Sequence, residues 1–434
     1  MQKISYIAKT ATLALALLTA SANYAQTTDA LGTYTPYSIF GIGDIAKQGT
    51  ALNRGMGGIG VGLSTNKFIN HLNPASIVNR DTLSFMLDFG VEQKNIYNSN
   101  GNLNSAYNVF NMHNLIITAP IMKKSALIMG ITQFSDVGYK FEKTETDPLI
   151  VSQMGDVKYQ IYGTGGISKA FIGGAYGILP GLSLGLEGVY YFGTIDRNSA
   201  IIFNSSSDYR NIVTGFDYVV GAFSGKLGVQ YSKTFENSLS LTAGATYSLK
   251  TKLKGDMTRF SMSESVSGVI DTMTFVVNKD TKLDIPAELA FGFTLSKSDK
   301  WLVGADYVRQ DWSKSNFASN SSIAFKPVVS NSYRIGGEYT PNRFDIRYFL
   351  KRCTYRAGLY YENTYMNVAG KQINSMGITL GMSLPIYQLN NAIGVAVDFG
   401  QRGSLKNNLV RERYVNFVIN IHLHDIWFQK FRYD

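Results

Sequence analysis

The chain has 434 residues, of which 13% are aromatic and only 17% are charged. Charged residues make up about 25% of an ordinary soluble domain, so this composition argues against a string of soluble globular domains. The formal net charge is +10, but the basic residues are dispersed, and the sequence predicts no nucleic-acid-binding surface. The single cysteine, Cys353, excludes an internal disulfide.

The first 25 residues have the pattern of a secretory signal peptide. Lys3 and Lys9 precede a short apolar stretch, and small residues follow at Ala20, Ala22 and Ala25. The apolar stretch is too short for a helix that spans a membrane. We expect cleavage after Ala22 or Ala25, with Ala25 favoured, and we expect an exported protein. The later sequence contains no apolar run of about 20 residues, so no transmembrane helix is predicted.

The segment 26–80 is rich in glycine and precedes the first predicted strand. We predict that it folds back into the lumen of a barrel as a hatch, because close packing there favours glycine. The candidate hatch residues are Gly55, Met56, Gly57, Gly58, Asn73 and Pro74.

The rest of the chain, 81–424, alternates apolar and polar residues in long segments, as half-buried strands do. For example, Met376, Ile378 and Leu380 alternate with glycine, threonine and serine. The pattern predicts about 14 strands, near 83–97, 108–119, 126–142, 158–174, 182–196, 216–233, 239–254, 285–296, 301–313, 330–340, 354–363, 372–384, 392–401 and 413–424. We therefore expect an all-β fold, a transmembrane antiparallel β-barrel, because single-chain bacterial barrels have even strand numbers.

The predicted connections distinguish this barrel from a soluble β-sandwich. Long polar loops are predicted at 98–107, 198–215, 255–284 and 314–329, and most of the other connections are short turns. The connection 341–353 is the exception, longer than a turn. Long outer loops alternating with short periplasmic turns are typical of outer-membrane barrels. We accordingly expect an integral outer-membrane protein with both termini in the periplasm.

Two local features need their own interpretation. Asp136 and Gly138 interrupt the alternation of the third strand, which predicts either a kink or an ordinary β-bulge. Beyond the last strand, the segment 425–434 is aromatic and basic, and it is predicted to be a periplasmic docking tail that carries Trp427, Phe428 and Phe431.

Several segments, in this order, give the chain a resemblance to a known family. They are Gly55–Gly58, Asn73–Ala75, Pro286–Gly292, Trp301–Ser313, Tyr333–Pro341 and Tyr355–Tyr361. Together they resemble the FadL-type outer-membrane transport proteins, which are channels for long-chain fatty acids and hydrocarbons. The resemblance implies fourteen strands and an N-terminal hatch. It also implies a hydrophobic ligand that enters from outside and leaves sideways through a gap at a kinked strand.

Two functions follow from these patterns. The first is passive uptake of hydrophobic small molecules such as long-chain fatty acids, with outer-membrane lipid and the ligand as partners. The second is a β-barrel subunit or scaffold of an envelope protein complex, in secretion or outer-membrane assembly, with other envelope proteins as partners.

We predict no enzyme, cofactor or metal site. Gly55–Gly60 matches a dinucleotide fingerprint, but no strand precedes it and no helix follows it. Gly181–Gly185 matches the esterase elbow, but it opens an alternating strand instead of a strand-to-helix turn. His422 and His424 share one strand face, and two ligands alone make a weak metal site.

Overall fold

The structure is a computed structural model, which describes residues 31–79, 84–101, 103–203, 209–265, 270–297, 300–317, 325–386 and 391–426. The chain divides into two units, Met1–Leu31 and Gly32–Asp434, and the second contains the fold described below. The predicted signal peptide and the tail residues Trp427, Phe428 and Phe431 lie outside the described residues.

Strands dominate the second unit. They are β1 (Asp44–Ile45), β2 (Ser84–Ser99), β3 (Asn104–Met122), β4 (Ser125–Asp136), β5 (Tyr139–Thr144), β6 (Val157–Leu179), β7 (Leu182–Phe203), β8 (Asn211–Thr234), β9 (Leu239–Ser248), β10 (Thr251–Glu264), β11 (Ile270–Ile285), β12 (Glu288–Lys297), β13 (Trp301–Asp311), β14 (Phe325–Pro327), β15 (Val329–Tyr339), β16 (Thr354–Val368), β17 (Lys371–Pro385), β18 (Ala392–Gly403) and β19 (Arg411–Ile426). The helices are short: η2 (Pro36–Ile39), α2 (Ala51–Arg54), η3 (Pro74–Val78), α3 (Pro148–Met154), η4 (Trp312–Lys314), α4 (Phe349–Arg352) and η5 (Lys406–Asn408). No helix among the described residues is long and apolar enough to cross a membrane.

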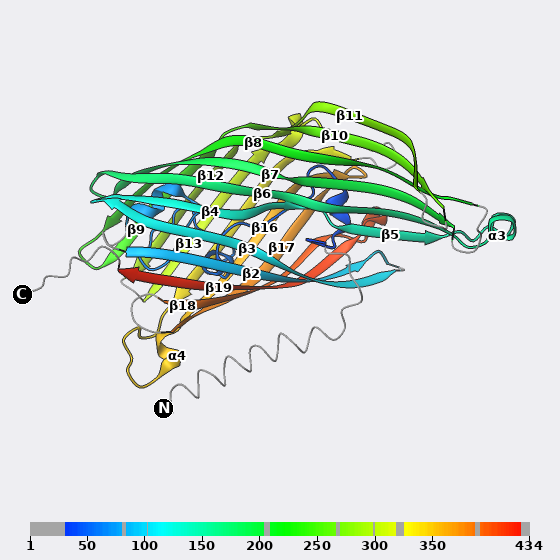
Figure 1. Ribbon diagram of the computed structural model, residues 1–434. Coiled ribbons are helices and arrows are strands. Elements are labelled where there is room, and N and C mark those ends of the chain that lie inside the picture. The colour runs from blue at the N-terminus through cyan, green and yellow to red at the C-terminus, as the bar shows by residue number, and fades with distance from the viewer. Residues whose placement is uncertain are drawn as a thin grey trace, which may run out of the picture. The chain divides into compact units, whose positions relative to one another are not determined.

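The strands close into one antiparallel barrel (Figure 1). β4 with β5, β9 with β10, β11 with β12, and β14 with β15 each make up one strand of the wall, so the described residues form fourteen. The last strand pairs with the first, from Arg411 beside Ser99 to Ile426 beside Ser84. The predicted barrel of about 14 strands is therefore confirmed.

The predicted loops 198–215 and 255–284 are wrong in extent, because strand pairing continues into them. β7 runs on to Phe203 and β8 begins at Asn211. β10 and β11 pair from Thr251 beside Ile285 to Glu264 beside Ile270, across a region predicted to be loop. Water wets both faces of a hairpin that extends beyond the wall, so its side chains need not alternate although its backbone hydrogen bonds continue.

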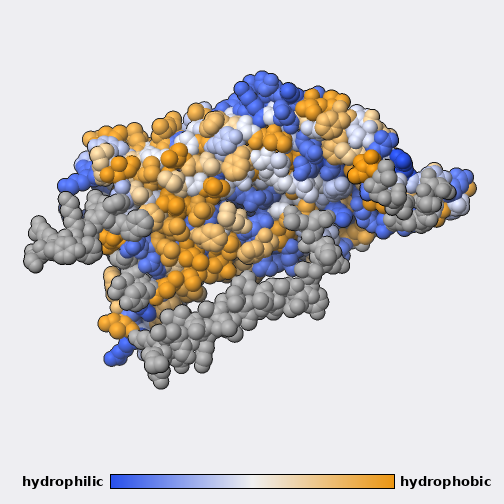
Figure 2. All heavy atoms as spheres, viewed as in Figure 1, coloured by the Kyte–Doolittle hydropathy of each residue, from blue (hydrophilic) through white to orange (hydrophobic). Residues whose placement is uncertain are grey.

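The outer face carries an apolar band between two aromatic rows. Trp301, Tyr339 and Tyr355 are register neighbours on β13, β15 and β16 near the short turns, and Tyr307, Tyr333 and Tyr361 form the second row. Along β15 the two rows lie six residue positions apart, from Tyr333 to Tyr339, which is about 20 Å of extended strand. On the face shown in Figure 2, hydrophobic side chains gather over the part of the barrel nearer these turns. Aromatic girdles around an apolar band are typical of transmembrane barrels.

Charge placed inside this band should destabilise the barrel more than charge at its edge. Leu380 and Met376 are both about half exposed on β17, at 51% and 52%, but Leu380 lies within the band and Met376 pairs with Tyr361 of the aromatic row. We expect Leu380→Arg to cost about 2–4 kcal/mol and Met376→Arg about 0–1 kcal/mol. Guanidinium unfolding in lipid vesicles measures both, and equal losses would contradict a transmembrane band at this position.

Candidate functional site

The N-terminal segment, defined here as residues 32–79, packs against the inner side of the wall. Its helix α2 contacts β17, β18 and β19, whereas η3 contacts β4, β6, β7 and β8. Figure 1 shows these short helices in blue within the ring of strands. The segment therefore crosses the lumen between parts of the wall that are several strands apart.

Glycines allow backbone-to-backbone contact where the segment leaves α2. A Cβ atom on Gly57 would lie 2.7 Å from the Leu359 carbonyl oxygen and 2.9 Å from that of Ile335, and φ at Gly57 is +71°. The Gly57 N–H also donates a 2.7 Å hydrogen bond to Thr379 Oγ1. The neighbouring Met56 is fully buried. The predicted Gly-Met-Gly-Gly residues thus sit directly on β15, β16 and β17.

The Asn-Pro-Ala residues contact the opposite part of the wall. Asn73 accepts a hydrogen bond from the Ala75 N–H, which caps η3, and its side-chain amide donates to the carbonyl oxygens of Val61 and Val229. Pro74 packs on Gly185, where a Cβ would lie 2.9 Å from the Pro74 Cβ. The structure places all six candidate hatch residues against the wall, but in two separate contacts.

The third strand of the wall is interrupted between β4 and β5. β4 ends at Asp136 and β5 begins at Tyr139, and the N-terminal segment fills the break. Ser38 Oγ donates to the Gly138 carbonyl oxygen and accepts from the Gly138 N–H, both at 3.1 Å. Beside it, β1 pairs with β4 through Asp44 with Asp136 and Ile45 with Ser135. The gap covers Val137 and Gly138 and keeps the register with β6, because Asp136 faces Gly166 and Tyr139 faces Gly163. The Val137 N–H still donates to the Gly165 carbonyl oxygen of β6, whereas the backbone of Gly138 is bonded by Ser38.

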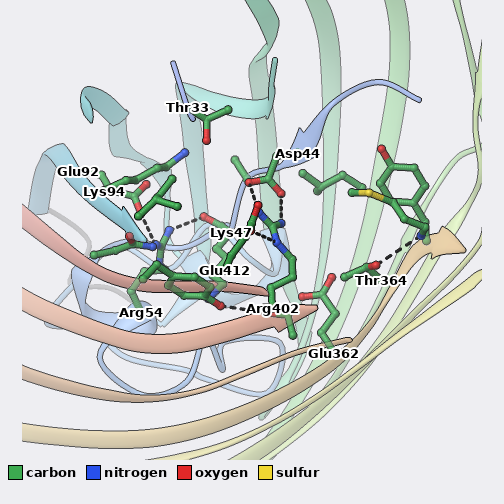
Figure 3. A pocket seen from close by; sticks show the side chains of 18 residues that line it. Thr33, Asp44, Lys47, Arg54, Glu92, Lys94, Glu362, Thr364, Arg402 and Glu412 are labelled. Atoms are coloured by element: carbon green, nitrogen blue, oxygen red, sulfur yellow. Dashed lines mark hydrogen bonds and ion pairs between the residues drawn. The ribbon is translucent and has the colours of Figure 1, made fainter. Parts of the chain in front are cut away.

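Buried ion pairs fasten the segment to the wall (Figure 3). Lys47 lies 2.6 Å from Asp398, and Arg54 lies 2.6 Å from Glu92. Arg402 of β18 lies 2.5 Å from Asp44, which belongs to the segment, and 2.7 Å from Glu412 of β19. These pairs leave a cavity of about 70 Å³ between them, which suits a few water molecules.

The buried Lys47 and Arg54 side chains stay protonated because of their ion-pair partners. Burial lowers the pKa of Lys47, but the Asp398 carboxylate and the Tyr414 hydroxyl together raise the pKa above its ordinary value. Arg54 follows the same rule, with Glu92 raising the pKa against the effect of burial. Both side chains therefore stay protonated and paired at neutral pH, because an unpaired buried charge would be far more costly.

A second charged cavity of about 90 Å³ lies beside η3 and is lined by Lys169, Glu187, Lys226 and His71, among others. Burial and the two lysines lower the pKa of His71 well below its ordinary value, so this imidazole is neutral at pH 7. Lys226 donates to the Leu72 carbonyl oxygen at 2.7 Å. This cavity too has room for water rather than for a long hydrocarbon.

An apolar cluster surrounds the first part of the segment. Tyr37, Phe40 and Ile42 are buried in one cluster with Val137 and Tyr139 at the break. The same cluster continues through Ile167, Ile195, Tyr218, Trp312, Phe325 and Tyr365. Phe40 stacks on Phe325 at 4.9 Å between ring centres.

Few polar contacts cross this cluster. Tyr365 donates to the Gly43 carbonyl oxygen at 2.7 Å, and Arg197 donates to that of Gly41 at 2.7 Å. Sequence reasoning missed the cluster because Phe325 lies within 314–329, which is predicted to be a polar loop, and Trp312 lies at the end of the strand predicted before it. The one available signal was the density of aromatic residues there.

The glycine contact can be tested with a matched pair of substitutions. Gly57 and Gly370 both have positive φ, at +71° and +78°, but a Cβ on Gly370 would meet nothing within 4 Å. Both alanine variants incur the left-handed penalty of about 1–2 kcal/mol. We expect Gly57→Ala to cost about 1–3 kcal/mol more through overpacking, measured by denaturant unfolding. Equal losses of unfolding free energy in the two variants would show that Gly57 is not in close contact with the wall.

The Arg54–Glu92 pair should show strong coupling. Both side chains are almost fully buried, with 4% and 6% exposed. Glu92→Leu alone leaves an unpaired buried charge and should cost about 3–5 kcal/mol, whereas adding Arg54→Met should restore most of that loss. Unfolding of the two single variants and the double variant forms the thermodynamic cycle. Additive losses would mean that the two charges do not interact.

Solved structures share this architecture. The toluene transporter TbuX of Ralstonia pickettii is 18% identical with a TM-score of 0.56, and the alignment covers 87% of this chain and 98% of that one. The toluene transporter TodX of P. putida is 17% identical with a TM-score of 0.56, covering 88% and 100%. A Pseudomonas aeruginosa FadL homologue is 14% identical with a TM-score of 0.55, covering 89% and 100%. The chain therefore has the FadL-type barrel fold, as its sequence predicted.

No curated protein matches the chain. A family model does match it, over residues 7–434, which is nearly the whole sequence. That model describes a family separate in name from the hydrocarbon transporters that share the fold. By this match the chain belongs to the BamG family.

Proposed function

We propose that this protein is an outer-membrane channel for passive uptake of small hydrophobic molecules, held closed here by its N-terminal segment acting as a hatch. One observation carries the proposal: a separate piece of chain fills both the break in the third strand and the apolar cluster behind it. Withdrawal of residues 32–45 would expose Val137 and Tyr139 at the break. It would also separate Asp44 from Arg402, which keeps Glu412 as its partner. The same movement would empty the space now taken by Tyr37, Phe40 and Ile42.

The membrane location is supported by the wall itself. The apolar band and its two aromatic rows match the outer face of a transmembrane barrel. The N-terminal pattern of a signal peptide supports export. With the short turns in the periplasm, as in other outer-membrane barrels, both chain ends fall on the periplasmic side.

The distribution of charge favours a sideways route. Ion pairs involving Lys47, Arg54 and Arg402 fill the lumen near α2 and β1. An apolar ligand gains nothing from displacing buried pairs, since breaking them exposes unpaired charge. The apolar cluster, in contrast, includes Val137 and Tyr139 at the break, where the adjacent Asp136 is itself paired with Lys94 at 2.8 Å. A ligand would therefore leave through the wall, toward lipid.

The chemistry of the cluster suits an apolar or largely apolar ligand. Aromatic side chains such as Trp312, Phe325 and Tyr365 line it, and aromatic surfaces bind flat hydrocarbons and alkyl chains well. Long-chain fatty acids and monoaromatic hydrocarbons both fit this description. Two of the proteins with similar structures are toluene transporters, which makes toluene a practical probe.

A second function is favoured by a different observation. The charged cavities are small, about 70 and 90 Å³, and the first is lined by the deeply buried pair of Arg54 and Glu92. A barrel that never opens would suit a subunit or scaffold of an envelope protein complex, with its outer surfaces contacting partners. Membership of a family with its own name, apart from the transporters, is compatible with such a role.

A disulfide across β1 and β4 separates the two functions. Ile45 and Ser135 are register partners in an antiparallel pair, and such pairs lie close enough for a disulfide. In a Cys353→Ser background, Ile45→Cys with Ser135→Cys should abolish uptake of radiolabelled toluene and oleate by cells lacking the native gene. A reductant should restore uptake.

The control is a disulfide between two neighbouring wall strands that do not move in the proposed opening. Leu359 and Ile378 are register partners on β16 and β17 within the wall, so Leu359→Cys with Ile378→Cys should leave uptake unchanged. Uptake that persists in the oxidised β1–β4 variant would contradict the channel. If no variant transports, and the locked variant still co-purifies with envelope proteins in stoichiometric amounts, the scaffold function is supported.

A further inference from the structure

The connection between β15 and β16, residues 340–353, presents apolar side chains to the surroundings. Ile346 is 97% exposed, Phe344 80% and Leu350 63%. Tyr348 and Phe349 are also exposed, at 58% and 43%. Other connections at this end, such as those after β3 and β6, are two-residue turns. Large apolar residues gathered on one exposed loop usually mark a binding surface.

The loop is ordered by its own hydrogen bonds. Asp345 accepts from the N–H groups of Arg347 and Tyr348, at 2.9 and 2.7 Å. The Asn342 N–H donates to the Lys351 carbonyl oxygen at 2.8 Å, which closes the loop at its base. The Tyr355 hydroxyl donates to the Leu350 carbonyl oxygen at 3.0 Å. The apolar side chains are thus held outward by a folded backbone.

Basic residues alternate with the apolar ones. The loop contains Arg343, Arg347, Lys351 and Arg352 and a single acid, Asp345. The Lys351 ammonium lies 4.6 Å from the centre of the Tyr348 ring, and the Arg352 guanidinium lies 5.2 Å from that of Phe349. Its excess of positive charge fits a negatively charged surface.

The position of the loop suggests which surface that is. The loop begins directly after Tyr339 and ends just before Tyr355. Both tyrosines belong to the aromatic row near the short turns. Figure 1 shows α4 and its loop projecting sideways from the barrel at this end, away from the lumen. Aromatic rows lie at the level of the lipid headgroups. A sideways projection at that level runs along the membrane surface.

We propose that loop 340–353 is an interfacial anchor that inserts Phe344, Ile346 and Leu350 into an anionic lipid leaflet. This inference rests on the proposed membrane location but not on transport. Interfacial segments bury their apolar side chains about 5–10 Å into the boundary of headgroups and acyl chains. The arginines and lysines would stay at the phosphates, each attracted to anionic headgroups. A lipid surface suits the loop better than a protein partner, because the loop projects at the level of the aromatic row, where the headgroups lie.

Fluorescence of a label on the loop tests the proposal. In full-length Cys353→Ser protein, Ile346→Cys is labelled with the environment-sensitive dye NBD and reconstituted in vesicles of equal parts phosphatidylethanolamine and phosphatidylglycerol. We expect blue-shifted emission, quenching by doxyl-labelled lipid and protection from iodide. The matched control is Leu149→Cys on α3 at the opposite end of the barrel, which is 73% exposed and should stay accessible to iodide.

Two comparisons define the outcome. Phosphatidylcholine vesicles, or Arg347→Ser with Lys351→Ser, should reduce the quenching by doxyl lipid, because both remove the electrostatic contribution. A label at 346 that iodide quenches as fully as the label at 149 would overturn the proposal. Protection in native membranes but not in lipid vesicles would also overturn it, in favour of a protein partner. Heat-modifiable migration of each variant in SDS gels shows that the barrel is folded. Uptake is measured in a separate assay.

Discussion

The requirement that lipid imposes on the backbone governs this structure. Inside a bilayer no water is available to pair with exposed N–H and C=O groups, so a sheet must close on itself. The pairing of β19 with β2 meets that requirement over the full length of both strands. Closure also fixes which side chains face lipid and which face the lumen, because neighbours along a strand point to opposite faces. The apolar band outside and the charged groups inside are two results of one constraint.

Closure creates an interior that has to be filled, and the N-terminal segment fills it in two different ways. Near α2, charges from the segment and from the wall are brought together in buried pairs such as Arg54 with Glu92. Near η2, the filling is apolar, with Phe40 stacked on Phe325. Buried pairs hold geometry firmly because separating them is costly, whereas apolar contacts are non-directional and can be exchanged for a ligand. In the proposed channel, this division gives the segment a fixed part and an exchangeable part.

The break in the third strand belongs to the exchangeable part. Ser38 satisfies the backbone of Gly138 in place of a continuous strand. Backbone groups near lipid need a partner at all times, so an opening here requires that something replace Ser38 when the segment moves. Water that enters as the segment leaves could bond the Gly138 backbone. Alternatively, β4 and β5 could join into one continuous strand. The proposed channel and the proposed scaffold differ in whether this exchange takes place.

Strand periodicity determined most of the wall from the sequence alone, because each lipid-facing strand alternates apolar and polar residues at period two. It placed the fourteen strands of the wall. It failed where hairpins such as β10 with β11 extend into water, since both faces are wet there and alternation disappears. The tertiary structure alone decided the partners inside the lumen. Lys47 and Asp398, or Tyr37 and Val137, are brought together by closure of the barrel around a segment with no periodicity of its own, and long-range pairing of that kind leaves no local pattern in the chain.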